Sequence, residues 1–235
     1  MEIKAVFFDL DGTLLPMDQE EFTKTYFKLL AARLAPLGYE PRKLVDSIWA
    51  GTAAMVKNDG SCVNEEAFWR TFVEIYGEGA LKDKPCIDAF YWEEFNKAKS
   101  VCGFTAAARQ VVDIVKEKGK IPVLATNPIF PAVATENRIR WAGLVPEDFA
   151  LYTTYENSCY SKPNPQYYLE IVKEIGCKPQ ECLMVGNDVA EDMVAETIGM
   201  KVFLLTDCLL NKKEQDISGF SKGGFKELKE YLNML

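Results

Sequence analysis

The sequence predicts an α/β fold, in which helices cover both faces of a mainly parallel sheet and an all-helical segment follows the first strand. Short apolar, β-branched runs alternate with helical patterns through the second half of the chain. This order is typical of crossover connections between parallel strands. A similar apolar run stands near the N-terminus, and a long segment with helical periodicity alone separates it from the rest.

The first strand is predicted at residues 3–10, an apolar run that ends in acidic residues and glycine. Residues 18–100 then carry apolar side chains at helical spacing, and no strand-like alternation interrupts them. The predicted helices of this segment lie near residues 22–34, 44–55, 68–75 and 87–98. We therefore expect an α/β core made of residues 1–17 and 101–235, with residues 18–100 as a separate helical domain.

Strands and helices alternate after Gly103. Buried strands are predicted at residues 121–126, 151–154, 183–185 and 201–205. Helices are predicted at residues 105–118, 131–143, 164–176, 190–198 and 225–235. Local residues support these ends: Asn164 is a good N-cap, Pro165 fits the first helical turn, and Gly176 can terminate the helix.

The composition is that of a folded globular chain. Its 235 residues are 48% hydrophobic and 26% charged, which argues against disorder. The net charge of −8 disfavours binding to nucleic acid, because no basic field exists to attract phosphate backbones. No apolar run reaches the roughly 18 residues of a membrane span, so we expect no membrane segment.

Histidine is absent, which excludes Ser-His-Asp and Cys-His catalysis as well as zinc sites of the His-Glu-x-x-His type. The seven cysteines are odd in number and form no Cys-x-x-Cys pair. This pattern favours reduced thiols over a disulfide framework, and we expect a cytoplasmic protein. Acid and base chemistry must then depend on carboxylates, Lys, Tyr or Cys.

Polar side chains follow four of the predicted strands. They are Asp9, Asp11 and Thr13 after the first strand, Thr126 and Asn127 after the second, Lys162 past the third, and Asn187, Asp188 and Asp192 after the fourth. In parallel α/β sheets the carboxyl ends of the strands form the ligand-binding edge. Taken singly, each group is also explained by a turn or a helix cap. Their joint order predicts a site at one edge of the sheet.

In this order the motifs resemble those of the haloacid dehalogenase superfamily, over essentially the whole chain. The run Asp9-Leu10-Asp11-Gly12-Thr13 is similar to the first motif of that family. Thr126 is similar to the second, Lys162 to the third, and Asn187-Asp188 with Asp192 to the fourth. The resemblance implies a Rossmann-like sheet with a helical cap inserted after the first motif, the position of residues 18–100.

The residue types suit phosphoryl transfer. A carboxylate can attack phosphorus, and a Mg²⁺ ion held by Asp9, the Asp11 carbonyl and the Asp188 region would offset the repulsion between anions. Lys162 adds a positive charge. Thr126 and Asn127 can hydrogen-bond phosphoryl oxygens. By resemblance, Asp9 is the nucleophile, Asp11 the acid and base, and Thr13 a supporting residue.

The fourth motif departs from the family pattern, which places Asp directly after the glycine where this chain has Asn187. Counting from Gly186 makes Asn187 the metal ligand, whereas counting back four residues from Asp192 makes Asp188 the ligand. Because Mg²⁺ prefers carboxylates, we expect Asp188 to contribute most, with Asn187 nearby and Asp192 orienting Lys162. The alternative is that Asp188 only caps the following helix.

The predicted function is a Mg²⁺-dependent phosphatase that hydrolyses a small phosphate monoester through an aspartyl phosphate. Within the family that the chain resembles, Asp11 favours an oxygen leaving group over a halide. A helical cap over the site implies a small phosphorylated metabolite as substrate. Three alternatives stay open: a sugar-phosphate mutase, a non-catalytic binding or regulatory protein on the same fold, and a receiver-like module. We expect a monomer or a weak dimer.

Overall fold

The computed structural model describes residues 2–235. At its centre these residues form a parallel sheet in the order β3-β2-β1-β4-β5-β6. The strands are β1 (Ala5–Phe8), β2 (Ile121–Leu124), β3 (Leu151–Tyr152), β4 (Cys182–Gly186), β5 (Lys201–Leu205) and β6 (Ser221–Gly223). The sheet starts near its middle with β1, and the chain then builds outward in both directions. This arrangement confirms the predicted α/β fold with a parallel sheet.

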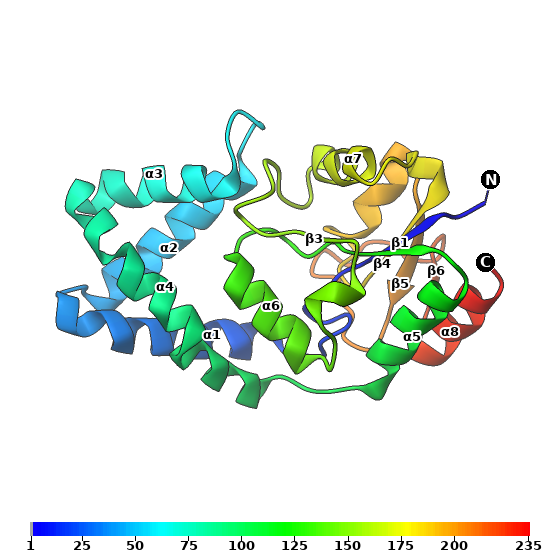
Figure 1. Ribbon diagram of the computed structural model, residues 1–235, viewed down its shortest axis with the longest axis horizontal. Helices are drawn as coiled ribbons and strands as arrows, with labels where there is room; N and C mark the ends of the chain where they lie inside the picture. Colours follow the sequence, from blue (N-terminus) through cyan, green and yellow to red (C-terminus); the bar gives the residue numbers. More distant parts are fainter. Residues whose placement is uncertain (1) are drawn as a thin grey trace.

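Helices without strands occupy the chain between β1 and the next core helix. They are α1 (Gln19–Leu34), η1 (Ala35–Leu37), α2 (Pro41–Val56), α3 (Asn64–Tyr76), η2 (Glu78–Asp83), α4 (Lys84–Trp92) and η3 (Glu94–Val101). Helices α1 to α4 gather at one end of the molecule, away from the sheet (Figure 1). No helix within residues 2–235 is long and apolar enough to cross a membrane.

The remaining helices connect the strands. They are α5 (Ala106–Glu117), α6 (Ala132–Trp141), η4 (Pro146–Asp148), α7 (Pro165–Glu174), η5 (Pro179–Glu181), η6 (Met193–Ile198) and α8 (Phe225–Asn233). Several begin at polar caps that the sequence provides. Asp18 accepts hydrogen bonds from the backbone N–H groups of Glu20 and Glu21 at 2.9 and 3.0 Å, and Asn164 accepts one from Gln166 at 3.0 Å.

The structure differs from the sequence-based prediction at three elements. Strand β6 was not predicted, because its Ser-Lys-Gly sequence lacks an apolar pattern. The helix expected at residues 190–198 is only the short η6, since the buried Asp192 is held in the turn before it. The helix expected at residues 87–98 is broken at Glu93, whose ψ of −86° interrupts α4 before η3.

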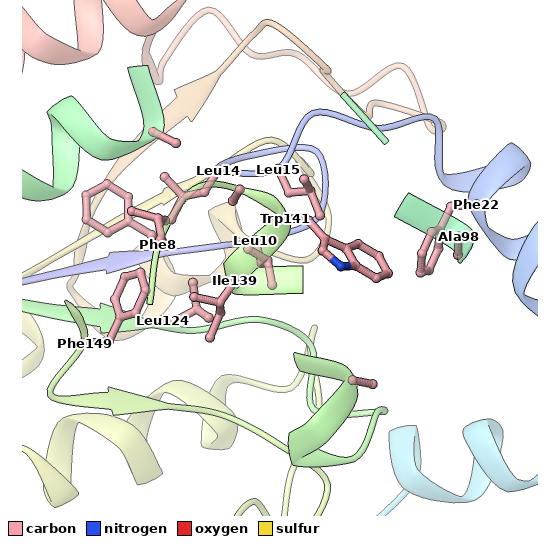
Figure 2. Packing of buried hydrophobic residues seen from close by; sticks show 14 of the residues in the cluster. Phe8, Leu10, Leu14, Leu15, Phe22, Ala98, Leu124, Ile139, Trp141 and Phe149 are labelled. Atoms are coloured by element: carbon pink, nitrogen blue, oxygen red, sulfur yellow. The ribbon is translucent and has the colours of Figure 1, made fainter. Parts of the chain in front are cut away.

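Two apolar clusters cover the faces of the sheet. Val6 and Phe8 belong to one cluster, and Ala5 and Phe7 belong to the other, as the alternation of a β-strand requires. The first cluster extends beyond the sheet into the helical segment. Figure 2 shows this continuity, from Phe8, Leu124 and Phe149 beside the sheet, past Leu10, Leu14, Leu15 and Trp141, to Phe22 and Ala98 in the helices. The segment of residues 18–100 is thus packed against the loop that leaves β1.

Candidate active site

The predicted residues of the first, second and fourth motifs follow three adjacent strands. Phe8 of β1 lies opposite Leu124 of β2 and Val185 of β4. The next residues along these strands therefore continue side by side at one edge of the sheet. A backbone hydrogen bond of 2.9 Å from the N–H of Asp9 to the carbonyl of Val185 prolongs this pairing. Parallel register alone brings these motifs together.

Lys162 lies at the centre of the site and is buried, with 1% of its surface exposed. Its ammonium group donates hydrogen bonds to Asp9 Oδ1 at 2.8 Å and to Asp192 Oδ1 at 2.6 Å. Burial alone would lower the pKa of Lys162, but the carboxylates of Asp192 and Asp9 raise it well above its usual value. The lysine therefore stays charged and fixes one oxygen of Asp9.

Asp192 is positioned by the turn that follows β4. Its Oδ2 accepts a hydrogen bond of 3.0 Å from the backbone N–H of Asp188. A Cβ atom on Gly186 would come within 2.1 Å of that same oxygen, so only glycine leaves room for the carboxylate. Asp192 thus stands behind Lys162, where the sequence analysis expected it.

Thr13 joins the first and fourth motifs. Its hydroxyl lies 3.1 Å from Asp9 Oδ2 and 3.0 Å from Asn187 Oδ1. The amide of Asn187 is oriented by a hydrogen bond of 2.7 Å from its Nδ2 to the carbonyl of Cys208. Gly12 has φ of +85°, and a Cβ there would approach Asn187 Nδ2 to 2.4 Å. Two oxygens, one from a carboxylate and one from an amide, therefore converge beside Thr13.

Asp188 does not take part in this convergence. Its Oδ1 accepts hydrogen bonds from the backbone N–H groups of Ala190 at 2.7 Å and Glu191 at 3.0 Å. The side chain caps the turn that leads to η6, which is the alternative that the sequence left open. The cap engages Oδ1 of Asp188, and the choice between Asp188 and Asn187 as the main metal ligand stays a prediction.

Thr126 and Asn127 lie at the end of β2 but are held differently. The backbone carbonyl of Thr126 accepts hydrogen bonds from Thr153 Oγ1 at 2.6 Å and the Tyr167 hydroxyl at 2.8 Å, which fixes the loop. Asn127 Nδ2 donates to Glu191 Oε2 at 3.1 Å. Burial raises the pKa of Glu191 to about 7. The sequence analysis did not single out Glu191, which sits in an ordinary helical pattern without a motif.

Asp11 forms an ion pair with Arg138 of α6. Arg138 is fully buried, its guanidinium lies 4.5 Å from the centre of the Phe130 ring, and it also bonds the Ala134 carbonyl at 3.2 Å. Burial raises the pKa of Asp11, and Arg138 opposes that rise. The sequence analysis missed Arg138. Its position four residues after Ala134 and three before Trp141 places it on the buried face of α6, and that placement could have identified it.

The oxygen set suits a hard divalent cation. Asp9 Oδ2 and Asn187 Oδ1 both lie within 3.1 Å of one hydroxyl, and Asp11 Oδ1 is buried without a hydrogen-bond partner. Among residues 2–235 no three Asp, Glu or Cys side chains are grouped to hold a metal ion. A Mg²⁺ ion does not need such a group, since it retains several waters and binds through one or two carboxylates together with substrate phosphate.

The fold brings carboxylates and a buried lysine together at one edge of a parallel sheet. In a comparison with protein families, residues 3–195 match the haloacid dehalogenase-like hydrolases. The match covers most of the chain, so the protein belongs to this family. The resemblance noted in the sequence is confirmed, as is the prediction of an enzyme that is a hydrolase of this type.

The relatives agree with the expected phosphatase class. A glyceraldehyde 3-phosphate phosphatase from Methanothermobacter thermautotrophicus is 27% identical over 222 residues, which cover 91% of this chain and 90% of that protein. Among solved structures, a HAD phosphatase from Thermococcus onnurineus has a TM-score of 0.57, 19% identity and 98% coverage of both chains. A 2-haloacid dehalogenase from Pseudomonas syringae has a TM-score of 0.65, 19% identity and 99% coverage of both chains. At such identities the structural likeness shows the fold alone.

Proposed function

We propose that the protein is a Mg²⁺-dependent phosphatase that hydrolyses small phosphate monoesters through a phosphorylated Asp9. The observation that carries this proposal is the Asp9 carboxylate at the end of β1, held by Lys162 on one oxygen and by Thr13 on the other. A fixed carboxylate beside a buried cation is suited to attack a phosphoryl group. Asp11 favours a phosphate ester as substrate over a haloacid, which a dehalogenase of the same fold uses. An alkoxide leaving group needs a proton, which a carboxylic acid can donate, whereas a halide leaving group does not.

In the first step an Asp9 oxygen forms a bond to phosphorus, and the bond from phosphorus to the ester oxygen breaks. Asp11 donates its proton to that oxygen, so the product leaves as a neutral alcohol. Lys162 faces the developing negative charge on the phosphoryl oxygens. We expect Thr126 and Asn127, at the end of β2, to donate hydrogen bonds to the same oxygens.

In the second step a water oxygen bonds to phosphorus while the bond between phosphorus and Asp9 breaks. Asp11, now a carboxylate, accepts the proton of that water. Inorganic phosphate leaves, and Asp9 returns to its carboxylate form. The two steps consume one ester and one water, and they yield one alcohol and one phosphate.

We propose that Asp9, Asn187 and the backbone carbonyl of Asp11 hold the cation. When bound, Mg²⁺ would neutralise phosphate charge in a protein whose net charge is −8. An amide oxygen from Asn187 adds no charge, so this chain offers a weaker site than two carboxylates would.

The seven cysteines, which form no disulfide in the described chain, are consistent with the expected reducing cytoplasm.

The test is release of inorganic phosphate from a panel of small esters, including glyceraldehyde 3-phosphate and sugar phosphates, with Mg²⁺ and with a chelator. We expect Mg²⁺-dependent release, and a loss of at least ~10³-fold in Asp9→Asn, because an amide is a poor nucleophile. Asp46→Asn changes an exposed carboxylate in the same way and is the control. Activity near wild type in a folded Asp9→Asn protein would refute the mechanism. Isomerised sugar phosphate without release of phosphate would identify a mutase instead.

A further inference from the structure

A cavity of about 150 Å³ lies between the helical segment and the loop that follows β2, and Asp11 forms part of its wall. Helices α1, α2 and α3 contribute most of the lining, and residues 129–131 close it from the core side. Among the described residues that line the cavity, Asp11 is the only charged one. The cavity therefore adjoins the side chain that we propose as the acid.

The lining is mainly aliphatic and aromatic, and its neutral polar groups include Gln19, Thr23, Thr52, Tyr155 and the buried, unpaired Nε1 of Trp69. Phe22, Phe68, Trp69 and Phe130 all face the cavity. The hydroxyls of Tyr26 and Tyr91, which also line it, lie 3.0 Å apart and bond each other. A polyol placed here would exchange its hydrogen bonds to water for few partners, and each group left unpaired would cost about 5- to 150-fold in affinity. The mostly apolar lining thus favours an apolar group over a polyol.

The dimensions suit one aromatic ring. A dry cavity of about 150 Å³ lined by aliphatic and aromatic side chains accepts a benzene-sized group. The lining rings already pack edge to face, as Trp69 and Phe72 do with ring centres 5.5 Å apart, and an added ring can join this packing. Trp49 lines the cavity and is 51% exposed, and it packs against Phe27. These two side chains mark where the cavity meets solvent.

We propose that this cavity binds the leaving group and that the substrate is a phosphate monoester of an alcohol carrying one aromatic ring. The inference rests on the proposed function, because it needs the ester oxygen to lie beside Asp11. The ring would fill the cavity while the phosphoryl group lies between Asp9 and Lys162. Burial of the apolar ring then provides the free energy of binding, whereas a sugar would depend on hydrogen bonds from polar side chains.

The experiment compares kcat/KM for benzyl phosphate and glycerol 1-phosphate, which both release a primary alcohol. We expect benzyl phosphate to be preferred by about 10- to 100-fold, from the burial of one ring. Ile48→Trp fills the cavity from α2 and should reduce this ratio to near one. Val56→Trp adds the same side chain at an exposed position of α2 that does not line the cavity, and it should leave the ratio unchanged.

A binding measurement separates this inference from the proposed function. Benzyl alcohol should raise the Tm of the wild-type protein, whereas glycerol at the same concentration should not, and neither result requires turnover. Equal kcat/KM for the two esters, with no effect of benzyl alcohol on Tm, would overturn the inference while the phosphatase stands. Stabilisation by benzyl alcohol without hydrolysis of any ester would refute the proposed function and keep the ligand class. If Ile48→Trp does not fold, the wild-type comparison of the two alcohols decides.

Discussion

Arg138 of α6, which is buried, and Asp11 of the loop after β1, whose side chain is 20% exposed, form an ion pair that links the proposed acid to the helix beside the helical segment. The guanidinium also packs over the Phe130 ring, so it is fixed on both sides. Its charge opposes the effect of burial on the Asp11 carboxyl. The pair therefore affects both the stability of the fold and the ionisation of the residue that should protonate the leaving group.

Removing one partner of this pair should destabilise the protein more than removing both charges. Arg138→Gln leaves Asp11 without its cation, and we expect the free energy of unfolding to fall by about 2–4 kcal/mol. Asp11→Asn added to that variant should recover part of the loss, because no charge is then left unpaired. Denaturant unfolding of the wild type, both single variants and the double variant measures the coupling. Strictly additive losses would show that the two residues do not interact.

Asp11→Asn should separate leaving-group protonation from nucleophilic attack. Asp9 remains, so we expect a large loss on alkyl phosphates, about 10²–10⁴-fold, and a much smaller one on nitrophenyl phosphate, whose leaving group needs no proton. Rates of phosphate release from both esters give the comparison, with Asp9→Asn as the variant that should fail on both. Equal losses of Asp11→Asn on the two substrates would contradict its role as the acid.

The fourth motif makes a distinct prediction about metal dependence. Asn187→Ala should raise the Mg²⁺ concentration for half-maximal turnover by about tenfold, because the cation then loses the amide oxygen as a ligand. Asn187→Asp should lower that concentration by adding charge. Asp188→Ala should cost about 1 kcal/mol of stability through the lost cap and leave the requirement for Mg²⁺ nearly unchanged. The opposite ranking of the two alanine variants would restore Asp188 as the ligand.

Asp148 should make the free energy of unfolding depend on pH in the acidic range. Burial alone would raise its pKa, but hydrogen bonds from Arg109 at 2.8 Å and Lys116 at 2.6 Å hold it well below its usual value. The ion pairs therefore stabilise the protein fully above the unfolded pKa of about 3.9, and the contribution is lost as pH falls below it. We expect Asp148→Asn to cost about 1–2 kcal/mol at pH 7 and progressively less below about pH 4.

Unfolding curves of this variant at several pH values check the prediction, and Asp113→Asn is the matched control. Asp113 also contacts Arg109 from the same region, at 3.4 Å, but its side chain is 46% exposed. We expect that control to change stability by less than about 0.5 kcal/mol at any pH. A constant difference between Asp148→Asn and the wild type from pH 7 to pH 3 would exclude the proposed linkage.

Much of the site could be predicted because it lies where strands end. Asp9, Thr126 and Asn187 each follow a run of apolar residues, and parallel strands must bring their carboxyl ends to one edge. Arg138 had only its spacing from the apolar Ala134 and Trp141 as a signal, and Glu191 had none. A single charged residue in a helical pattern is most often solvated, and its burial depends on which face the rest of the fold covers. Their roles are visible only when α6 and the turn after β4 are in place.

The sequence by itself determined the α/β class, the order of the first five strands and the main helices along the chain, and the set of polar residues at the edge of the sheet. Apolar periodicity and local caps carry that information, because both act between residues close in the chain. Tertiary structure alone decided that the Thr13 hydroxyl joins Asn187 to Asp9, that Arg138 pairs with Asp11, and that an aromatic cavity adjoins the site. Each of these depends on contacts between residues distant in sequence, whose side-chain directions no local pattern fixes.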